Sequence, residues 1–166
     1  MLKDELIKYY YPPNGYNYNC AEAMIRALND YYDFKLPEEM FYAASSYGGG
    51  CHHDELCGGL ASALAVLGVL YSVNGRGHDS TKLRELSDEL FKRFEERFKT
   101  SRCNQLKKEN YIPEHKCEAV LVIIADILED LINDNPVINN NPHVKRAVFR
   151  LPCKGLYRTA TLKGLV

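Results

Sequence analysis

Four of the six cysteines in this 166-residue sequence stand where helices are predicted to begin. A helix N-terminus carries about half a positive charge and free N–H donors. It therefore stabilises a thiolate, and we expect it to lower the thiol pKa from its usual value of about 8.5. Four such thiols facing one another would hold a thiolate-ligated metal centre, and the same arrangement would equally activate a redox pair. The four are Cys20, Cys57, Cys103 and Cys117.

Residues that favour the N-cap position of a helix precede three of these cysteines. The side chains of Asn, Asp and Ser accept hydrogen bonds from the first free N–H groups of a helix, so they mark its start. Cys117 opens the last apolar helix. The caps pair as Asn19 with Cys20, Asp54 with Cys57, and Ser101 with Cys103.

The spacing of the cysteines excludes two common kinds of site. No C-x-x-C stands anywhere in the chain, so neither a zinc ribbon nor a thioredoxin-type motif is present. The ligands would have to converge from four distant segments. The alternative is that each reduced cysteine is a small buried apolar side chain, and Cys57, within an apolar helix, fits this alternative best.

A second group of chemically capable side chains lies in residues 51–57, with the sequence Cys-His-His-Asp-Glu-Leu-Cys. This loop joins three glycines to a predicted helix start, so its side chains could reach the site beside Cys57. Imidazole and thiolate both suit zinc or iron. The alternative, favoured for His52 and His53, is a solvated loop. Cys51 is predicted to be an extra ligand or a resolving thiol.

The elements that would position these residues are helical, and we predict an all-α bundle around a central apolar helix. That helix, from 54 to 72, contains many small residues that would let other backbones approach it closely. Its most apolar stretch, 60–71, is too short to span a bilayer. The other predicted helices span about residues 2–11, 20–32, 37–47, 80–100 and 116–133, with a short turn around Cys103.

The charge is unevenly distributed, although the net charge is only −1. From residue 136 onward there are six basic residues and no acidic ones, against 15 basic and 22 acidic residues before it, a net charge of −7. We therefore predict a helical cysteine-containing domain, 1–135, and a basic tail, 136–166. The tail is expected to lie on its own acidic domain, and docking on a partner is the alternative.

The same features bear on location and partners. The first residues are polar and acidic, unlike a signal peptide, so a cytoplasmic protein is expected. In that reducing compartment six cysteines suggest metal binding or catalysis more than a disulfide scaffold. Tyrosines gather near the N-terminus without interleaved basic residues, which suits packing or an interface, such as that of a homodimer, and not nucleic acid. No membrane partner is expected.

Several segments match a known family together. The segments are 20–24 (Cys-Ala-Glu-Ala-Met), the glycine run 48–50, 57–64 (Cys-Gly-Gly-Leu-Ala-Ser-Ala-Leu), 67–68, 103–106 (Cys-Asn-Gln-Leu) and 117–120 (Cys-Glu-Ala-Val). In their order, spacing and context over about residues 20–133 the chain resembles the C_GCAxxG_C_C proteins, a family described as redox-active. It departs from the core motif at Gly59, at Ser62-Ala63 and at Leu56, changes that mostly keep the residues small.

The resemblance implies an all-helical domain with a redox role that could use an iron–sulfur cluster. The leading hypothesis is a cluster bound by Cys20, Cys57, Cys103 and Cys117, in an electron carrier that serves a redox partner protein. A second hypothesis is an oxidoreductase that exchanges thiols and disulfides, in which Cys57 attacks and Cys51 or Cys20 resolves. A third is a structural zinc domain or an interaction module. The cofactor alternatives are therefore zinc or none.

Overall fold

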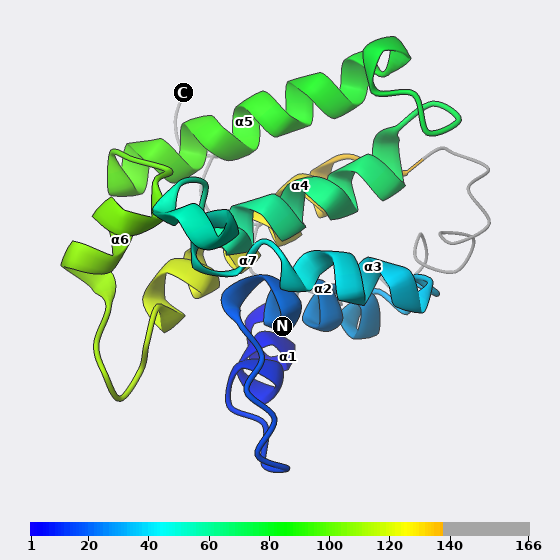
Figure 1. The fold of residues 1–166 in the computed structure, drawn as a ribbon. Helices are drawn as coiled ribbons and strands as arrows, with labels where there is room; N and C mark the ends of the chain where they lie inside the picture. The colour runs from blue at the N-terminus through cyan, green and yellow to red at the C-terminus, as the bar shows by residue number, and fades with distance from the viewer. Residues whose placement is uncertain (138–166) are drawn as a thin grey trace, which may run out of the picture.

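The computed structural model describes residues 1–137, which form seven α-helices and no β-strand (Figure 1). The all-α prediction is confirmed. The basic tail, apart from its first two residues, and Cys153 lie outside the described residues, so the docking of the tail stays a prediction. The helices are α1 (Leu2–Tyr10), α2 (Cys20–Tyr31), α3 (Glu38–Ser45), α4 (Gly58–Tyr71), α5 (Thr81–Phe98), α6 (Cys103–Asn110) and α7 (Glu118–Asp134).

Helix α4 packs against α2, α5 and α7. In Figure 1, α5 runs along one side of the molecule and α1 lies on the opposite side, with α2, α4 and α7 between them. The contact of α4 with α2 is close, because Ser62 is fully buried and its hydroxyl donates to the Ala21 carbonyl at 2.9 Å. This contact holds the N-terminal turns of the two helices together.

The start of α2 follows the prediction in detail. The Asn19 side chain accepts hydrogen bonds from the N–H groups of Ala21 and Glu22 at 2.9 and 3.0 Å. The Glu22 carboxylate in turn accepts from the N–H of Asn19 at 2.9 Å. This reciprocal pair is a capping box, which satisfies otherwise free donors and fixes where the helix begins.

Helix α1 is attached to α7 at its beginning by a buried carboxylate. Glu129, on α7, is 3% exposed and accepts a hydrogen bond from the Leu2 N–H at 3.2 Å. Its other oxygen accepts from the Tyr31 hydroxyl at 2.7 Å. Two donors therefore satisfy a carboxylate that would otherwise be costly to bury.

The predicted beginning of the central helix is wrong. Helix α4 begins at Gly58, because the backbone at Cys51, His52 and Asp54 is left-handed, with φ of 57°, 58° and 58°. A right-handed helix cannot continue through such residues. Asp54 is therefore not a cap, and its carboxylate instead accepts a hydrogen bond from the Lys107 ammonium at 3.2 Å.

The region of Cys103 also differs from the prediction. The sequence indicates a short turn there, whereas the structure has the eight-residue helix α6. Only Cys103 and Leu106 are buried in it, so the apolar spacing is too sparse to mark a helix.

Pro37 is the N-cap of α3, where the sequence predicts it as the first helical residue.

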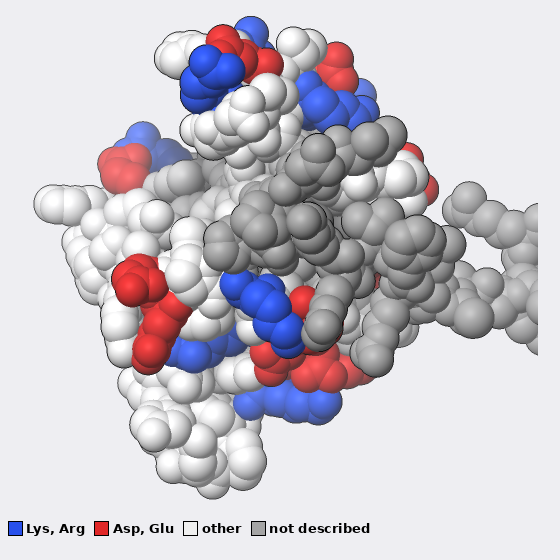
Figure 2. Space-filling model, turned by 90° about the vertical axis from the view of Figure 1, so that its right-hand side faces the viewer, with Lys and Arg blue, Asp and Glu red and all other residues white. Residues whose placement is uncertain are grey.

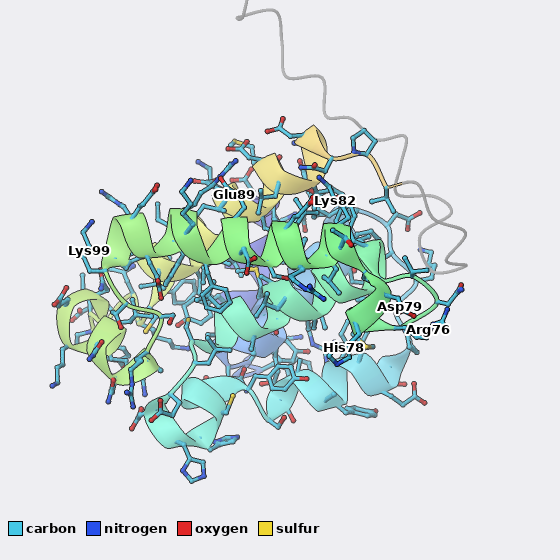
Figure 3. All side chains as sticks on the ribbon, turned by 90° about the horizontal axis from the view of Figure 1, so that it is seen from above. Arg76, His78, Asp79, Lys82, Glu89 and Lys99 are labelled. Carbon is cyan, nitrogen blue, oxygen red and sulfur yellow. The ribbon has the colours of Figure 1, made fainter. Side chains whose placement is uncertain are left out.

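Helix α5 separates an apolar stripe from a charged outer face. Leu86, Leu90 and Phe94 are buried, as the sequence predicts. Figure 3 shows the labelled charged residues along α5 and in the loop before it, where Arg76 pairs with Asp79 at 3.1 Å. On the face drawn in Figure 2, Lys and Arg lie beside Asp and Glu in small groups separated by uncharged surface. Such exposed pairs contribute roughly 0–1 kcal/mol each to stability.

Within residues 1–137, every helix is too short or too polar to cross a membrane.

We expect Gly58→Ala to lower the free energy of unfolding by about 1–3 kcal/mol, because the added Cβ overpacks the site. That Cβ would lie 2.6 Å from the Tyr47 carbonyl oxygen and 2.8 Å from the Cys20 sulfur. Gly68, in the same helix, has no atom within 4 Å of such a Cβ, so Gly68→Ala should stabilise by roughly 0.5–1 kcal/mol. Urea unfolding followed by circular dichroism measures both, and equal stability of the two variants would contradict the close approach.

Candidate functional site

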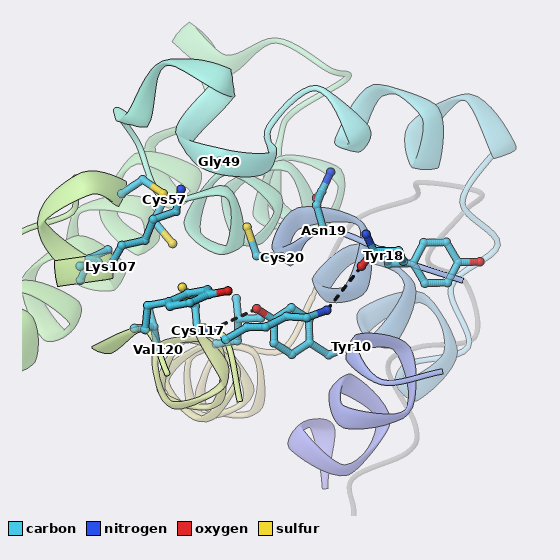
Figure 4. A pocket seen from close by; sticks show the side chains of 15 residues that line it. Tyr10, Tyr18, Asn19, Cys20, Gly49, Cys57, Lys107, Cys117 and Val120 are labelled. Carbon is cyan, nitrogen blue, oxygen red and sulfur yellow. Dashed lines mark hydrogen bonds between the residues drawn. The ribbon is translucent and has the colours of Figure 1, made fainter. Parts of the chain in front are cut away.

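Four cysteines from four separate segments line one cavity of about 270 Å³ (Figure 4). All four stand at helix starts. Cys20 and Cys103 are the first residues of α2 and α6, and Cys57 and Cys117 are the N-caps of α4 and α7. The placement that the sequence predicts for these thiols is therefore present in the fold. Asn19 is the cap of α2 as expected, whereas Asp54 and Ser101 are not the caps of α4 and α6.

A short antiparallel contact between two loops brings Cys57 and Cys103 together. The N–H of Cys57 donates to the Ser101 carbonyl at 2.9 Å, and the N–H of Cys103 donates to the Glu55 carbonyl at 2.5 Å. The backbone of Gly50 lies against the same place, since a Cβ there would be 2.6 Å from the Cβ of Cys103. These backbone contacts between loop residues help to position two of the thiols.

Tyrosines at the end of α1 hold the segment that carries Cys117. The Cys117 N–H donates to the Tyr10 hydroxyl at 3.1 Å. The Tyr11 hydroxyl donates to the His115 carbonyl at 2.6 Å, two residues before Cys117. Residues distant in sequence are joined in this way, and Tyr10 itself lines the cavity.

Backbone amides surround the sulfur of Cys20. The N–H groups of Gly49, Ala21, Cys20 itself and Gly59 all act to lower the pKa of this thiol. Gly49 can take part because its backbone is left-handed, with φ of 59°, a conformation that glycine adopts without strain. The glycine run before α4 therefore supplies a hydrogen-bond donor to the cavity.

The pKa shifts contradict the prediction that helix starts lower the thiol pKa values. Burial raises the pKa of all four thiols and is the largest influence on each. It raises the pKa of Cys57 to about 12 and that of Cys117 to about 11, and the nearby Cys20 adds to both shifts. Desolvation of a thiolate thus outweighs the helix N-termini. The thiols stay protonated at neutral pH unless a cation shares the cavity.

Two lysines contribute to the cavity lining. Lys107, on α6, acts against burial and lowers the pKa of both Cys103 and Cys117. The Lys116 ammonium lies 5.1 Å from the centre of the Tyr10 ring. Neither lysine nor Tyr10 is predicted from the sequence, because no local pattern links these residues to the cysteines.

The loop of Cys51, His52 and His53 lies apart from the cavity lining. All three residues are exposed, which agrees with a solvated loop for the two histidines. Cys51 is close enough to Cys103 to raise the pKa of that thiol. The predicted role of Cys51 as an extra ligand or resolving thiol stays a prediction.

The thiols are spread over the cavity wall. Within the described part of the chain, no group of three or more His, Cys, Asp or Glu side chains is arranged to hold a metal ion. The five cysteines described are all free thiols.

Comparison with known proteins finds one family whose model matches this chain. A model for the family described as "Putative redox-active protein (C_GCAxxG_C_C)" matches residues 18–131. This range contains all four cavity cysteines. No curated protein and no solved structure shows significant similarity to the chain.

We expect the cavity thiols to react slowly with iodoacetamide. In a metal-free Cys153→Ser variant at pH 8, exposed Cys51 should be modified first, and Cys57 and Cys117 should react on the order of a hundredfold more slowly, because the thiolate is the nucleophile. Their rates should rise about tenfold per pH unit up to pH 10, still below the raised pKa values. Mass spectrometry of peptides measures each rate. Equal rates at Cys51 and Cys57 would contradict the burial of the site.

Proposed function

Because the chain belongs to the C_GCAxxG_C_C family, we propose that it is a redox protein that binds an iron–sulfur cluster. The observation that carries the proposal is the cavity of about 270 Å³, whose wall contains four thiols from four segments. The cluster ligands are Cys20, Cys57, Cys103 and Cys117.

The chemistry of the donor set fits such a cluster. Cysteine thiolates are the usual ligands of iron–sulfur clusters, and several thiolates bind one cluster. Four separate thiols spread over a wall suit a group of several atoms. The bound cluster would supply one-electron transfer.

The surrounding backbone fits the same group. Amides of Gly49 and Gly59 act on the Cys20 thiol, and those of Gly59 and Leu60 act on Cys57. Hydrogen bonds from amides to cluster sulfurs are one of the means by which proteins set a reduction potential.

The charge balance of the cavity also supports the proposal that it binds an iron–sulfur cluster. Burial raises the pKa of every cavity thiol, so loading requires the thiols to release protons and a cation to replace them. Lys107 lowers the pKa of Cys103 and Cys117 and would offset part of the negative charge of the ligand set.

An electron carrier needs a redox partner protein and a way for electrons to reach it. Tyr111 lines the cavity and is 50% exposed, so the cavity wall reaches the surface there. The five cysteines within residues 1–137 are free thiols, which suits a reducing compartment such as the cytoplasm. The redox partner protein and the cytoplasmic location are both parts of this proposal.

The geometry favours this function over thiol–disulfide exchange. Cys57 is 6% exposed and its pKa is raised to about 12, which makes it a weak nucleophile. Of the two candidate resolving thiols, Cys51 is exposed and is not part of the cavity lining. Cys20 does line the cavity, but burial raises the pKa of its thiol as well.

The test is purification without oxygen, followed by a visible spectrum and analysis of iron, acid-labile sulfide and zinc. We expect a brown protein that contains iron and sulfide. Cys117→Ser should abolish stable loading, whereas Cys51→Ser and Cys153→Ser should load as the parent chain does. Circular dichroism of each variant checks that loss of loading is not loss of folding.

Three other results would contradict the proposed function or its ligand set. A colourless protein that contains zinc would indicate a structural zinc domain. A metal-free protein with a titratable pair of thiols would indicate the oxidoreductase. Full loading of Cys117→Ser would show that this cysteine is not a ligand.

A further inference from the structure

Tyr10, the last residue of α1, forms part of the cavity wall although it is no cysteine and lies outside the matched family segment. It is 5% exposed, and its hydroxyl oxygen accepts the Cys117 N–H at 3.1 Å (Figure 4). The phenol is therefore bonded to the backbone of one of the four cysteines, and the Cys117 thiol is near enough to affect its pKa. Cys20 is also near enough to affect its pKa.

The hydroxyl of Tyr10 still has a hydrogen to donate. A phenol is both an acceptor and a donor, and the bond from Cys117 uses only its acceptor side. Among residues 1–137, no hydrogen bond uses the donor side. Burial raises the pKa of Tyr10, so the hydroxyl keeps this hydrogen at neutral pH.

A cation strengthens this donor. The Lys116 ammonium lies 5.1 Å from the centre of the Tyr10 ring and 5.7 Å from that of Tyr11. The backbone of Lys116 is fixed by pairing with Ile112, whose N–H donates to the Lys116 carbonyl at 3.1 Å. A positive charge over the ring draws electron density from it and makes the O–H a better donor.

We propose that Tyr10 donates its O–H to a sulfur of the group bound in the cavity, beside Cys117, and so sets the reduction potential of that group. The inference rests on the proposed function. A donor at a cluster sulfur stabilises the more negative, reduced state, because hydrogen bonds to charged acceptors are the stronger ones. Tyr10 would therefore raise the potential.

The neighbours of Tyr10 in sequence provide matched controls. The Tyr9 hydroxyl donates to the Asp30 carboxylate, and the Tyr11 hydroxyl donates to the His115 carbonyl at 2.6 Å. Neither ring is part of the cavity lining. Tyr9→Phe removes one hydroxyl from the same helix without touching the cavity.

The experiment compares cluster-loaded parent chain, Tyr10→Phe and Tyr9→Phe in an optical redox titration. We expect the equilibrium constant for reduction to fall about tenfold or more in Tyr10→Phe, as loss of a hydrogen bond to a charged group implies, and to stay unchanged in Tyr9→Phe. Resonance Raman bands of the Fe–S bonds should shift in D2O for the parent chain, and less so for Tyr10→Phe.

A second substitution keeps the inference testable if Tyr10→Phe folds or loads poorly. Incorporation of 3-fluorotyrosine at position 10 keeps the hydroxyl and makes it a stronger donor, so the equilibrium constant for reduction should rise above that of the parent chain. A change in packing alone does not predict opposite shifts from phenylalanine and fluorotyrosine.

The outcomes separate this inference from the function on which it rests. A parent chain that binds no iron and sulfide would overturn the proposed function, and this inference with it. A loaded parent chain whose potential equals those of both Tyr10 variants would overturn the inference alone.

Discussion

Close approach of bare backbone to the cysteine side chains is the constraint on which the site depends. A Cβ at Gly58 would lie 2.8 Å from the sulfur of Cys20, and one at Gly50 would lie 2.6 Å from the Cβ of Cys103. At contacts this short, a side chain at either glycine would force its neighbours to shift. Because these contacts involve two of the four lining cysteines, glycine allows segments distant in sequence to converge on a cavity of about 270 Å³.

The same convergence creates an electrostatic conflict that a redox protein can use. Burial and mutual proximity hold the thiols neutral, whereas backbone amides and Lys107 favour the thiolates. A positively charged inorganic core would resolve the conflict, since it supplies the charge that the protein lacks. Without such a group, ionising four buried thiols together would be costly.

The sequence predicts the parts of this arrangement that depend on local interactions. The start of α2 is predictable because the Asn19 side chain and Glu22 satisfy its free amides within four residues. The start of α4 is not, because Cys51, His52 and Asp54 have left-handed backbones, and the Asp54 carboxylate is bonded to Lys107, a residue far along the chain. The sign of the thiol pKa shifts could not be predicted either, since it depends on burial, which appears only in the fold. Tyr10 is missed for the same reason.

The attachment of α1 at both of its ends has a mechanical consequence. Its first N–H is bonded to Glu129 near the end of α7, and its last residue is bonded to the N–H of Cys117 at the start of α7. The nine-residue helix α1 is thus bonded to the longer helix α7 at two separate points. Loss of one turn from α1 would free the cavity wall at Cys117, even though every cysteine would remain in place.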